Sequence, residues 1–142
     1  MASQGPLNPA TTADDAGVGT VVWASTGNST ASDDERATAT LNTGNPTSHY
    51  LKVTNFGFTI PSGATIDGIV VEIEKSESSS LDDVTDNRVR IVKGGTIGAT
   101  ERAAAGEWPT TDAYTTYGSS SDLWGETWAV GDINGTTFGV AI

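Results

Sequence analysis

From His49 to Ile73 the sequence reads HYLKVTNFGFTIPSGATIDGIVVEI, two runs of alternating apolar residues joined by a proline–glycine corner. Successive side chains of a β-strand point to opposite faces, so each run predicts a strand with one face in a core and the other in solvent. The corner Ile60-Pro61-Ser62-Gly63 is a turn signal, because proline fixes φ and glycine accepts positive φ. Such runs with a short turn between them are typical of an antiparallel β-sandwich.

The alternation changes phase within the first run. Its apolar residues are Leu51 and Val53 before the change and Phe56, Phe58 and Ile60 after it. An extra residue near Asn55 would keep both sets on the core side, so we expect a β-bulge there. In the second run Ile69, Val71 and Ile73 alternate with positions that include two glutamates, which predicts a half-buried strand with its acids in water.

The rest of the chain also carries signals of short strands. Helical periodicity is scarce, threonine, valine and isoleucine are abundant, and glycine and serine recur at short intervals. We predict strands at Thr20–Ala24, Arg36–Leu41, Tyr50–Ile60, Ile66–Lys75, Asn87–Lys93, Thr127–Val130 and Thr137–Ile142. The long loops would be Gly27–Glu35, Ser76–Asp86 and Gly94–Trp124, the last with a helical turn at Ala103–Ala105. The expected fold is all-β, a single antiparallel jelly-roll-like β-sandwich.

Composition narrows the class of protein. A chain of 142 residues fits one domain with a core of its own, and the lack of cysteine excludes disulfides and thiolate metal sites. The 18 acids against 7 bases give a net charge of -11, which opposes binding to nucleic acid or to an anionic membrane surface. The N-terminus lacks the features of a signal peptide, and no apolar run approaches the roughly 20 residues that span a bilayer.

The two ends of the chain point to contacts with other proteins. Residues 1–19 are rich in glycine and proline and poor in large apolar residues, so we expect an extended N-terminal arm that docks on the sandwich of residues 20–142 or on a neighbouring subunit. The final strand places Phe138, Val140 and Ile142 on one face. A bare apolar edge recruits other chains. Either this strand lies inside its sheet, or another chain covers its flank, or the natural protein continues beyond Ile142.

Several segments together resemble a known kind of domain. They are Trp23 with Asp33-Asp34, YLKVTNFGFTIPSGATIDGIVVEIE at 50–74, RVRIVKGG at 88–95, and YGSSSDLWGETWAVGDINGTTFGVAI at 117–142. This pattern is similar to a β-sandwich domain of virion structural proteins of tailed bacteriophages. The resemblance implies a jelly-roll-like sandwich with a role in head decoration, fibre or tail attachment and no assigned activity. In that pattern the segment matching FGVAI is followed by a spacer and a further strand, which this chain lacks.

Catalysis has little support in the residues. His49 is the single histidine, so a serine–histidine–acid triad would depend on it, and no G-x-S-x-G motif presents a serine nucleophile. A lone histidine at the start of a strand is far more often a surface or core residue. We therefore expect a protein that is not an enzyme, with no catalytic residue and no cofactor.

Two ligand-binding alternatives stay open. Calcium prefers oxygen ligands in loops, and the oxygen-rich clusters are Asp14-Asp15, Asp33-Asp34-Glu35, Asp82-Asp83 with Asp86, and Asp132-Ile133-Asn134. None matches an EF-hand, and Asp33 or Asp34 could instead cap a turn by accepting backbone N–H bonds. Carbohydrate could stack on the aromatic group Trp108, Tyr114, Tyr117, Trp124 and Trp128, although Trp128 has the phase of a core residue and Trp124 lies in a compact turn.

The sequence thus predicts a non-enzymatic virion structural protein, a capsid decoration or fibre- or tail-associated subunit on the surface of a phage particle. Its expected partners are identical subunits in a homo-oligomer and other virion proteins, joined by pairing of strand edges between chains. The alternatives are a carbohydrate-binding or adhesion module, with or without calcium, and a subunit of an extracellular filament.

Overall fold

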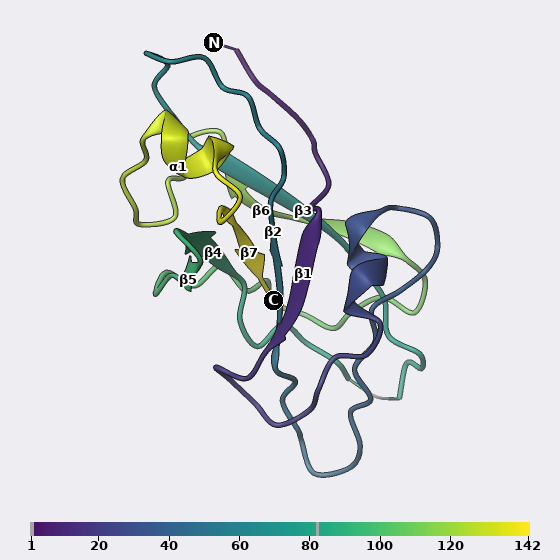
Figure 1. Ribbon diagram of the computed structural model, residues 1–142. Helices are drawn as coiled ribbons and strands as arrows, with labels where there is room; N and C mark the ends of the chain where they lie inside the picture. Colours follow the sequence, from purple (N-terminus) through teal and green to yellow (C-terminus); the bar gives the residue numbers. More distant parts are fainter. Residues whose placement is uncertain (1, 82) are drawn as a thin grey trace.

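The computed structural model describes residues 2–81 and 83–142 and consists mostly of strands and loops (Figure 1). The strands are β1 (Thr11–Asp15), β2 (Tyr50–Thr54), β3 (Ile69–Lys75), β4 (Arg90–Lys93), β5 (Thr96–Ile97), β6 (Ala113–Ser119) and β7 (Gly139–Ala141). The helical elements are the 3₁₀ turn η1 (Thr26–Thr30) and the short helix α1 (Val130–Asn134). The prediction of an all-β class is confirmed.

The strands form two antiparallel sheets. One has the order β1-β2-β7-β4-β5, and the other pairs β3 with β6. In the larger sheet Val140 of β7 is opposite Val53 of β2 on one side and Ile91 of β4 on the other. The last strand therefore lies inside its sheet, which is the first of the three alternatives left open by the sequence.

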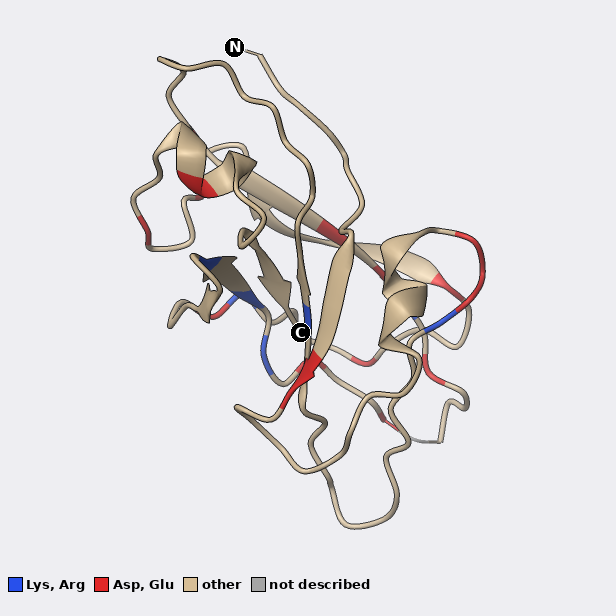
Figure 2. Cartoon of the chain, viewed as in Figure 1, with Lys and Arg blue, Asp and Glu red and all other residues tan. Residues whose placement is uncertain are grey.

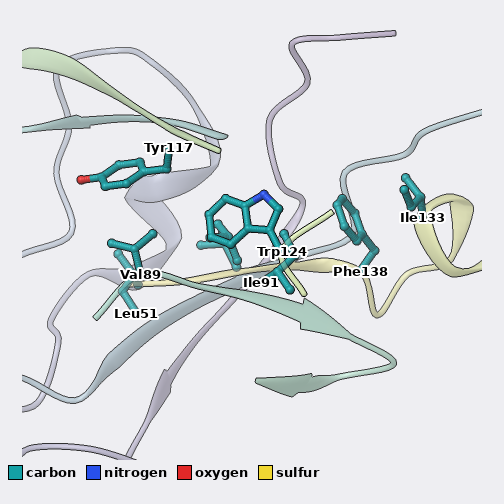
Figure 3. Close-up of a cluster of buried hydrophobic side chains, with 9 residues drawn as sticks. Leu51, Val89, Ile91, Tyr117, Trp124, Ile133 and Phe138 are labelled. Carbon is teal, nitrogen blue, oxygen red and sulfur yellow. The ribbon is translucent and has the colours of Figure 1, made fainter. Parts of the chain in front are cut away.

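The core lies between the two sheets. It gathers buried residues from β2, β4, β6 and β7, from the position before β4, and from the loop and helix that precede β7: Leu51, Val53, Val89, Ile91, Tyr117, Trp124, Ile133, Phe138 and Val140. Trp124 is 1% exposed and lies at the centre of this cluster (Figure 3), and its indole N–H donates to the carbonyl of Ile69 at 2.9 Å. Burial of a ring this large is among the strongest single contributions to such a core.

The change of phase predicted at Asn55 is present, but it is made differently. Asn55 adopts a left-handed φ of 63°, β2 ends at Thr54, and the residues after it continue without a strand partner. Leu51 and Val53 on one side of Asn55, and Phe56, Phe58 and Ile60 on the other, pack on the same core. Asparagine tolerates this conformation better than most residues. A single left-handed residue therefore keeps the apolar side chains before and after Asn55 on the core side, as a bulge was expected to do.

The segment after Asn55 is held in place by side chains. Asn134 of α1 accepts from the Ile60 N–H at 2.8 Å and donates to the Ile60 carbonyl at 2.9 Å, as a neighbouring strand would. The turn that follows closes with the N–H of Ala64 on the carbonyl of Pro61, with Gly63 at φ 86°. It begins one residue later than predicted, because the left-handed glycine must occupy its third position.

Three predicted strands are wrong. Thr20–Ala24 and Arg36–Leu41 make isolated bridges, Val21 with Ser48 and Ala24 with Thr38, and no ladder. Thr127–Val130 is not a strand because α1 begins at Val130, where Asp132 accepts the N–H of Ala129 at 2.9 Å and so caps the helix. Ala103–Ala105 is not helical either. In stretches this short, tertiary pairing decides the structure more than the local pattern of residues does.

Three strands were not predicted. β1 lies in the segment taken for an arm, where it forms the edge of the larger sheet, and β5 and β6 lie in the segment taken for a loop. β6 contributes Tyr117 to the core and is otherwise composed of small or polar residues. The strands predicted at Tyr50–Ile60, Ile66–Lys75, Asn87–Lys93 and Thr137–Ile142 are confirmed in shorter form as β2, β3, β4 and β7.

Candidate functional site

A cleft of about 1220 Å³ opens into the space between the two sheets. β3 lines it, as do residues 2–9 and the segment 28–37 that includes the end of η1, where the Ser32 hydroxyl donates to Glu74 of β3 at 3.2 Å. The cleft is also lined by core residues such as Leu51, Val53 and Val140. This volume exceeds the roughly 300–1,000 Å³ of most small-molecule pockets, so its size fits a larger occupant.

The wall formed by β3 is an unpaired strand edge. Within the described part of the chain β3 has β6 as its strand neighbour and none on its other side. The N–H of Ile69 donates to Asp122 at 2.9 Å and that of Glu77 to Pro109 at 2.8 Å, both on the β6 side. Because ladder bonds alternate along a strand, the backbone groups of Val70, Glu72 and Glu74 are directed to the open side.

The cleft exposes apolar side chains that belong to the core. The following residues pack on the buried cluster but remain only partly buried and line the cleft: Phe56, Phe58, Ile60, Ile66, Ile69, Val71 and Ile73. Phe58 contacts Phe138 edge to face, with ring centroids 5.9 Å apart. An apolar surface of this kind, continuous with a core and bordered by polar residues, marks an interaction site.

The rim of the cleft is acidic. The carboxylates that line it without a salt bridge in the described structure are Asp33, Asp34, Glu35, Asp67, Glu72 and Glu74. The two cations there are already paired, Arg36 with Asp112 and Lys75 with Asp86. Figure 2 shows the acids of the loop after η1 on the right-hand side of the molecule. The uncompensated charge at this site is therefore negative.

The N-terminal segment that lines the cleft is attached by few hydrogen bonds. Gln4 donates to the hydroxyl of Thr59 at 3.0 Å and accepts the N–H of Thr59 at 2.7 Å, and the N–H of Ala10 donates to Asn55 at 2.9 Å. Residues 2–8 are exposed. The N-terminal segment thus follows the chain after β2 and leaves the edge of β3 uncovered.

His49 has a structural role in this geometry. Its Nδ1 lies 2.8 Å from Asp14 Oδ2, and Asp14 Oδ1 accepts the backbone N–H of Trp23 at 2.8 Å. The indole N–H of Trp23 in turn donates to the carbonyl of His49 at 2.8 Å. A triad would also need a hydroxyl on the other ring nitrogen, and the described residues supply none. The contacts join β1, Trp23 and the start of β2.

Several of the acids singled out as calcium candidates are engaged by protein donors. Asp15 accepts from Gly17 and Lys52, and Asp33 accepts the N–H of Glu35 at 3.2 Å, the turn cap considered for it. Asp132 caps α1, and Asn134 binds Ile60. Asp82 lies outside the described residues. Across residues 2–81 and 83–142, no three His, Asp or Glu side chains converge as a metal site.

Asp86 belongs to a buried polar cluster. Its side chain is 0% exposed and accepts from Lys75 Nζ at 2.6 Å, Tyr117 Oη at 2.7 Å, Trp108 Nε1 at 2.7 Å and the Ala104 N–H at 3.0 Å. Burial opposes ionisation, but these four hydrogen bonds outweigh it and hold the pKa of Asp86 below its usual range. Burial and the nearby Asp86 carboxylate raise the pKa of Tyr117. The cluster fixes the loops around β3 and β6.

The aromatic group considered for carbohydrate does not form one exposed face. Trp124 and Tyr117 are buried, and Trp128 meets Phe138 edge to face at 5.5 Å. Trp108 lies against Lys75, whose Nζ is 5.0 Å from its ring centroid. Tyr114 is 56% exposed, and its hydroxyl lies 2.9 Å from that of Ser32. Trp128 packs against the core but is only partly buried, and the anchoring of the loop around Trp124 by its own ring is confirmed.

Acid is expected to destabilise the fold. The carboxyl groups whose pKa is lowered in the folded state are Asp14, Asp86, Glu101, Asp112 and Asp122. Below an ordinary pKa of 3.8 for aspartate or 4.5 for glutamate, the unfolded chain binds more protons than the folded one. Their contribution is therefore complete above these values and is lost as the pH falls through the lower folded pKa values.

This prediction is checked by thermal unfolding monitored by circular dichroism, from about pH 6 to about pH 2.5. About 0.15 M salt limits the effect of net charge on stability. The melting temperature should fall steadily below about pH 4. A melting temperature that stays constant or rises over that interval would contradict it.

The sequence did not indicate the cleft, because its central feature is the lack of a second neighbour for β3. The alternation of Ile69, Val71 and Ile73 indicates that one face of β3 packs on the core, but it does not indicate that one edge of β3 is unpaired. No helix in the described residues has the length and apolar character needed to cross a membrane. Comparisons with known protein families, with curated proteins and with solved structures find no match to this chain.

Proposed function

We propose that this chain is a non-enzymatic structural subunit that acts by binding other proteins, and that the cleft beside β3 is where an extended segment of a partner docks. The observation that carries the proposal is the unpaired edge of β3 next to exposed core side chains. An added strand would gain backbone hydrogen bonds from Val70, Glu72 and Glu74 and bury its own apolar residues on Ile69, Val71 and Ile73. This is the β-augmentation mode of recognition.

The setting we propose is the surface of a tailed-phage particle, as a capsid decoration or a fibre- or tail-associated subunit. The resemblance of residues 50–74 and 117–142 to a virion sandwich domain supports it. The partners in this proposal are other virion proteins and further copies of the chain. The strands of the described residues number seven, with β1 of the N-terminal segment among them, so one added strand would give the eight of a jelly roll.

Replacing Glu72 with proline is expected to abolish this docking. Proline removes an N–H directed to the open side, which the β3–β6 ladder does not use, so an edge strand can accept it. The matched control is Glu72→Ala, which removes the carboxylate and keeps the N–H. The chain would be produced in cells together with the products of its neighbouring genes, so that particles can assemble. The particles would be purified on a density gradient, and mass spectrometry would measure how much of the chain they contain.

Wild type and Glu72→Ala should both co-purify with particles, while Glu72→Pro should fall at least about tenfold because several backbone hydrogen bonds are lost together. Circular dichroism verifies that the proline variant is folded. Particles that retain a folded Glu72→Pro at the wild-type level would exclude the cleft as the docking site. Absence of the wild-type chain from particles would exclude the virion role.

A further inference from the structure

The chemistry of the cleft specifies its occupant, on the basis of the proposed function above. We propose that the segment which docks on β3 belongs to a different protein, and that in it apolar residues alternate with lysine or arginine. The inference combines the two faces of β3, an apolar face packed on the core and an acidic face exposed at the rim of the cleft.

Cross-strand pairing relates each face of β3 to one set of residues in the added strand. Ile69, Val71 and Ile73 point inward and are partly buried, so the residues opposite them must be apolar to complete the core. Glu72 and Glu74 are exposed on the other face, where directly opposite side chains lie close enough to interact. Opposite charges stabilise such pairs and like charges destabilise them, so basic residues fit opposite the glutamates.

The acids outside β3 extend the same preference. Asp33, Asp34 and Glu35 also line the cleft and Asp67 precedes β3, so an occupant meets carboxylates beyond those of β3 itself. Arg36 and Lys75 do not offset them, because Asp112 and Asp86 already neutralise these cations. A cleft lined by charge of one sign concentrates ligands of the opposite sign.

A second copy of this chain fits the cleft less well than a basic partner. Each copy carries a net charge of -11, so self-association brings like charges together. The stretch in which basic and apolar residues alternate, Arg88 to Lys93, already contributes β4 to the larger sheet and the buried Val89, Ile91 and Val92 to the core. It could occupy the cleft of another copy only if that sheet came apart.

Three end-capped octapeptides test the proposal against the whole chain. The first, Lys-Val-Lys-Ile-Lys-Val-Lys-Ile, has the alternation described above. The second has glutamate at every lysine position, and the third has the composition of the first with its lysines and apolar residues in two blocks. Binding is measured by fluorescence anisotropy in low and physiological salt, and amide hydrogen exchange is followed by NMR.

The alternating lysine peptide should bind at least about tenfold more tightly than the glutamate and block peptides. The difference in affinity between the lysine and glutamate peptides should be smaller in physiological salt than in low salt. It should slow exchange at Val70, Glu72 and Glu74. Glu72→Lys should weaken binding of the lysine peptide and strengthen that of the glutamate peptide. The matched control Glu107→Lys changes an exposed acid outside the cleft and should leave both affinities unchanged.

The outcomes separate this inference from the proposed function. Equal affinity for the lysine and glutamate peptides, with exchange slowed on β3, would overturn the basic occupant and leave strand docking intact. Failure of every alternating peptide to slow exchange on β3 would overturn docking itself. Slow exchange on β3 in the absence of peptide, together with dimers in sedimentation, would identify a second copy as the occupant and overturn the inference.

Discussion

Replacing Asp86 with alanine is expected to lower the free energy of unfolding by about 3–5 kcal/mol, because it leaves the ammonium of Lys75 buried without its counterion. The side chain of Lys75 is 7% exposed and that of Asp86 is 0% exposed, so water cannot compensate for the loss. Tyr117, Trp108 and Ala104 would lose the same acceptor. Domains of this size are stabilised by about 5–15 kcal/mol, so the variant should be close to unfolding at room temperature.

Urea denaturation measured by circular dichroism checks the expected loss. Arg36→Ala is the matched control, since it breaks the solvent-exposed ion pair with Asp112 and should leave the midpoint close to that of wild type. The double variant Lys75→Met, Asp86→Asn should recover part of the lost stability, because it removes the buried charge as well as its counterion. A midpoint for Asp86→Ala equal to that of Arg36→Ala would contradict a stabilising role for the cluster.

Truncation of Trp124 to alanine should be about as damaging, at about 3–5 kcal/mol, because it opens a large cavity at the centre of the core. Trp124 is 1% exposed, packs between the two sheets, and donates a hydrogen bond to Ile69 at the start of β3. It also adopts a φ of 56°, which is rare for a bulky residue and indicates that packing holds the backbone there.

Chemical denaturation of Trp124→Ala gives the magnitude, and Trp124→Phe should retain part of the stability because it keeps an aromatic ring in the cavity. Tyr114→Ala, at an exposed tyrosine of β6, is the control and should change stability by no more than about 0.5 kcal/mol. Equal stability of the two alanine variants would contradict the central position of Trp124.

The sequence predicts those parts of the fold in which burial alternates clearly. Ile69, Val71 and Ile73 appear on the inward face of β3 as expected, and the phase change at Asn55 is where the pattern places it. β6 was not predicted because Tyr117 is its single buried residue and its other residues show no regular alternation of burial. Pairing with β3 stabilises β6 as a strand although its own composition does not favour one, and a local sequence pattern does not reveal such tertiary pairing.

The candidate site was harder to predict than the fold, because it depends on pairings between distant segments. Whether β3 has one neighbour or two is decided by where β1 and β7 go, and both join β2. Asp86 illustrates the same limit. Among loop acids it resembles a solvated or metal-binding carboxylate, and only the approach of Lys75, Trp108 and Tyr117 identifies it as a buried counterion.

The position of β7 makes the larger sheet depend on a narrow junction. Three residues, Gly139–Ala141, connect the β1–β2 pair to the β4–β5 pair, and Val140 faces both Val53 and Ile91. The β1–β2 pair and the β4–β5 pair cannot align with each other until β7 has paired with both. Assembly of the sheet therefore requires closure of a very long loop and should be slow. While it proceeds, the flanks of β2 and β4 are available to other chains, so the chain is more prone to aggregate during folding than afterwards.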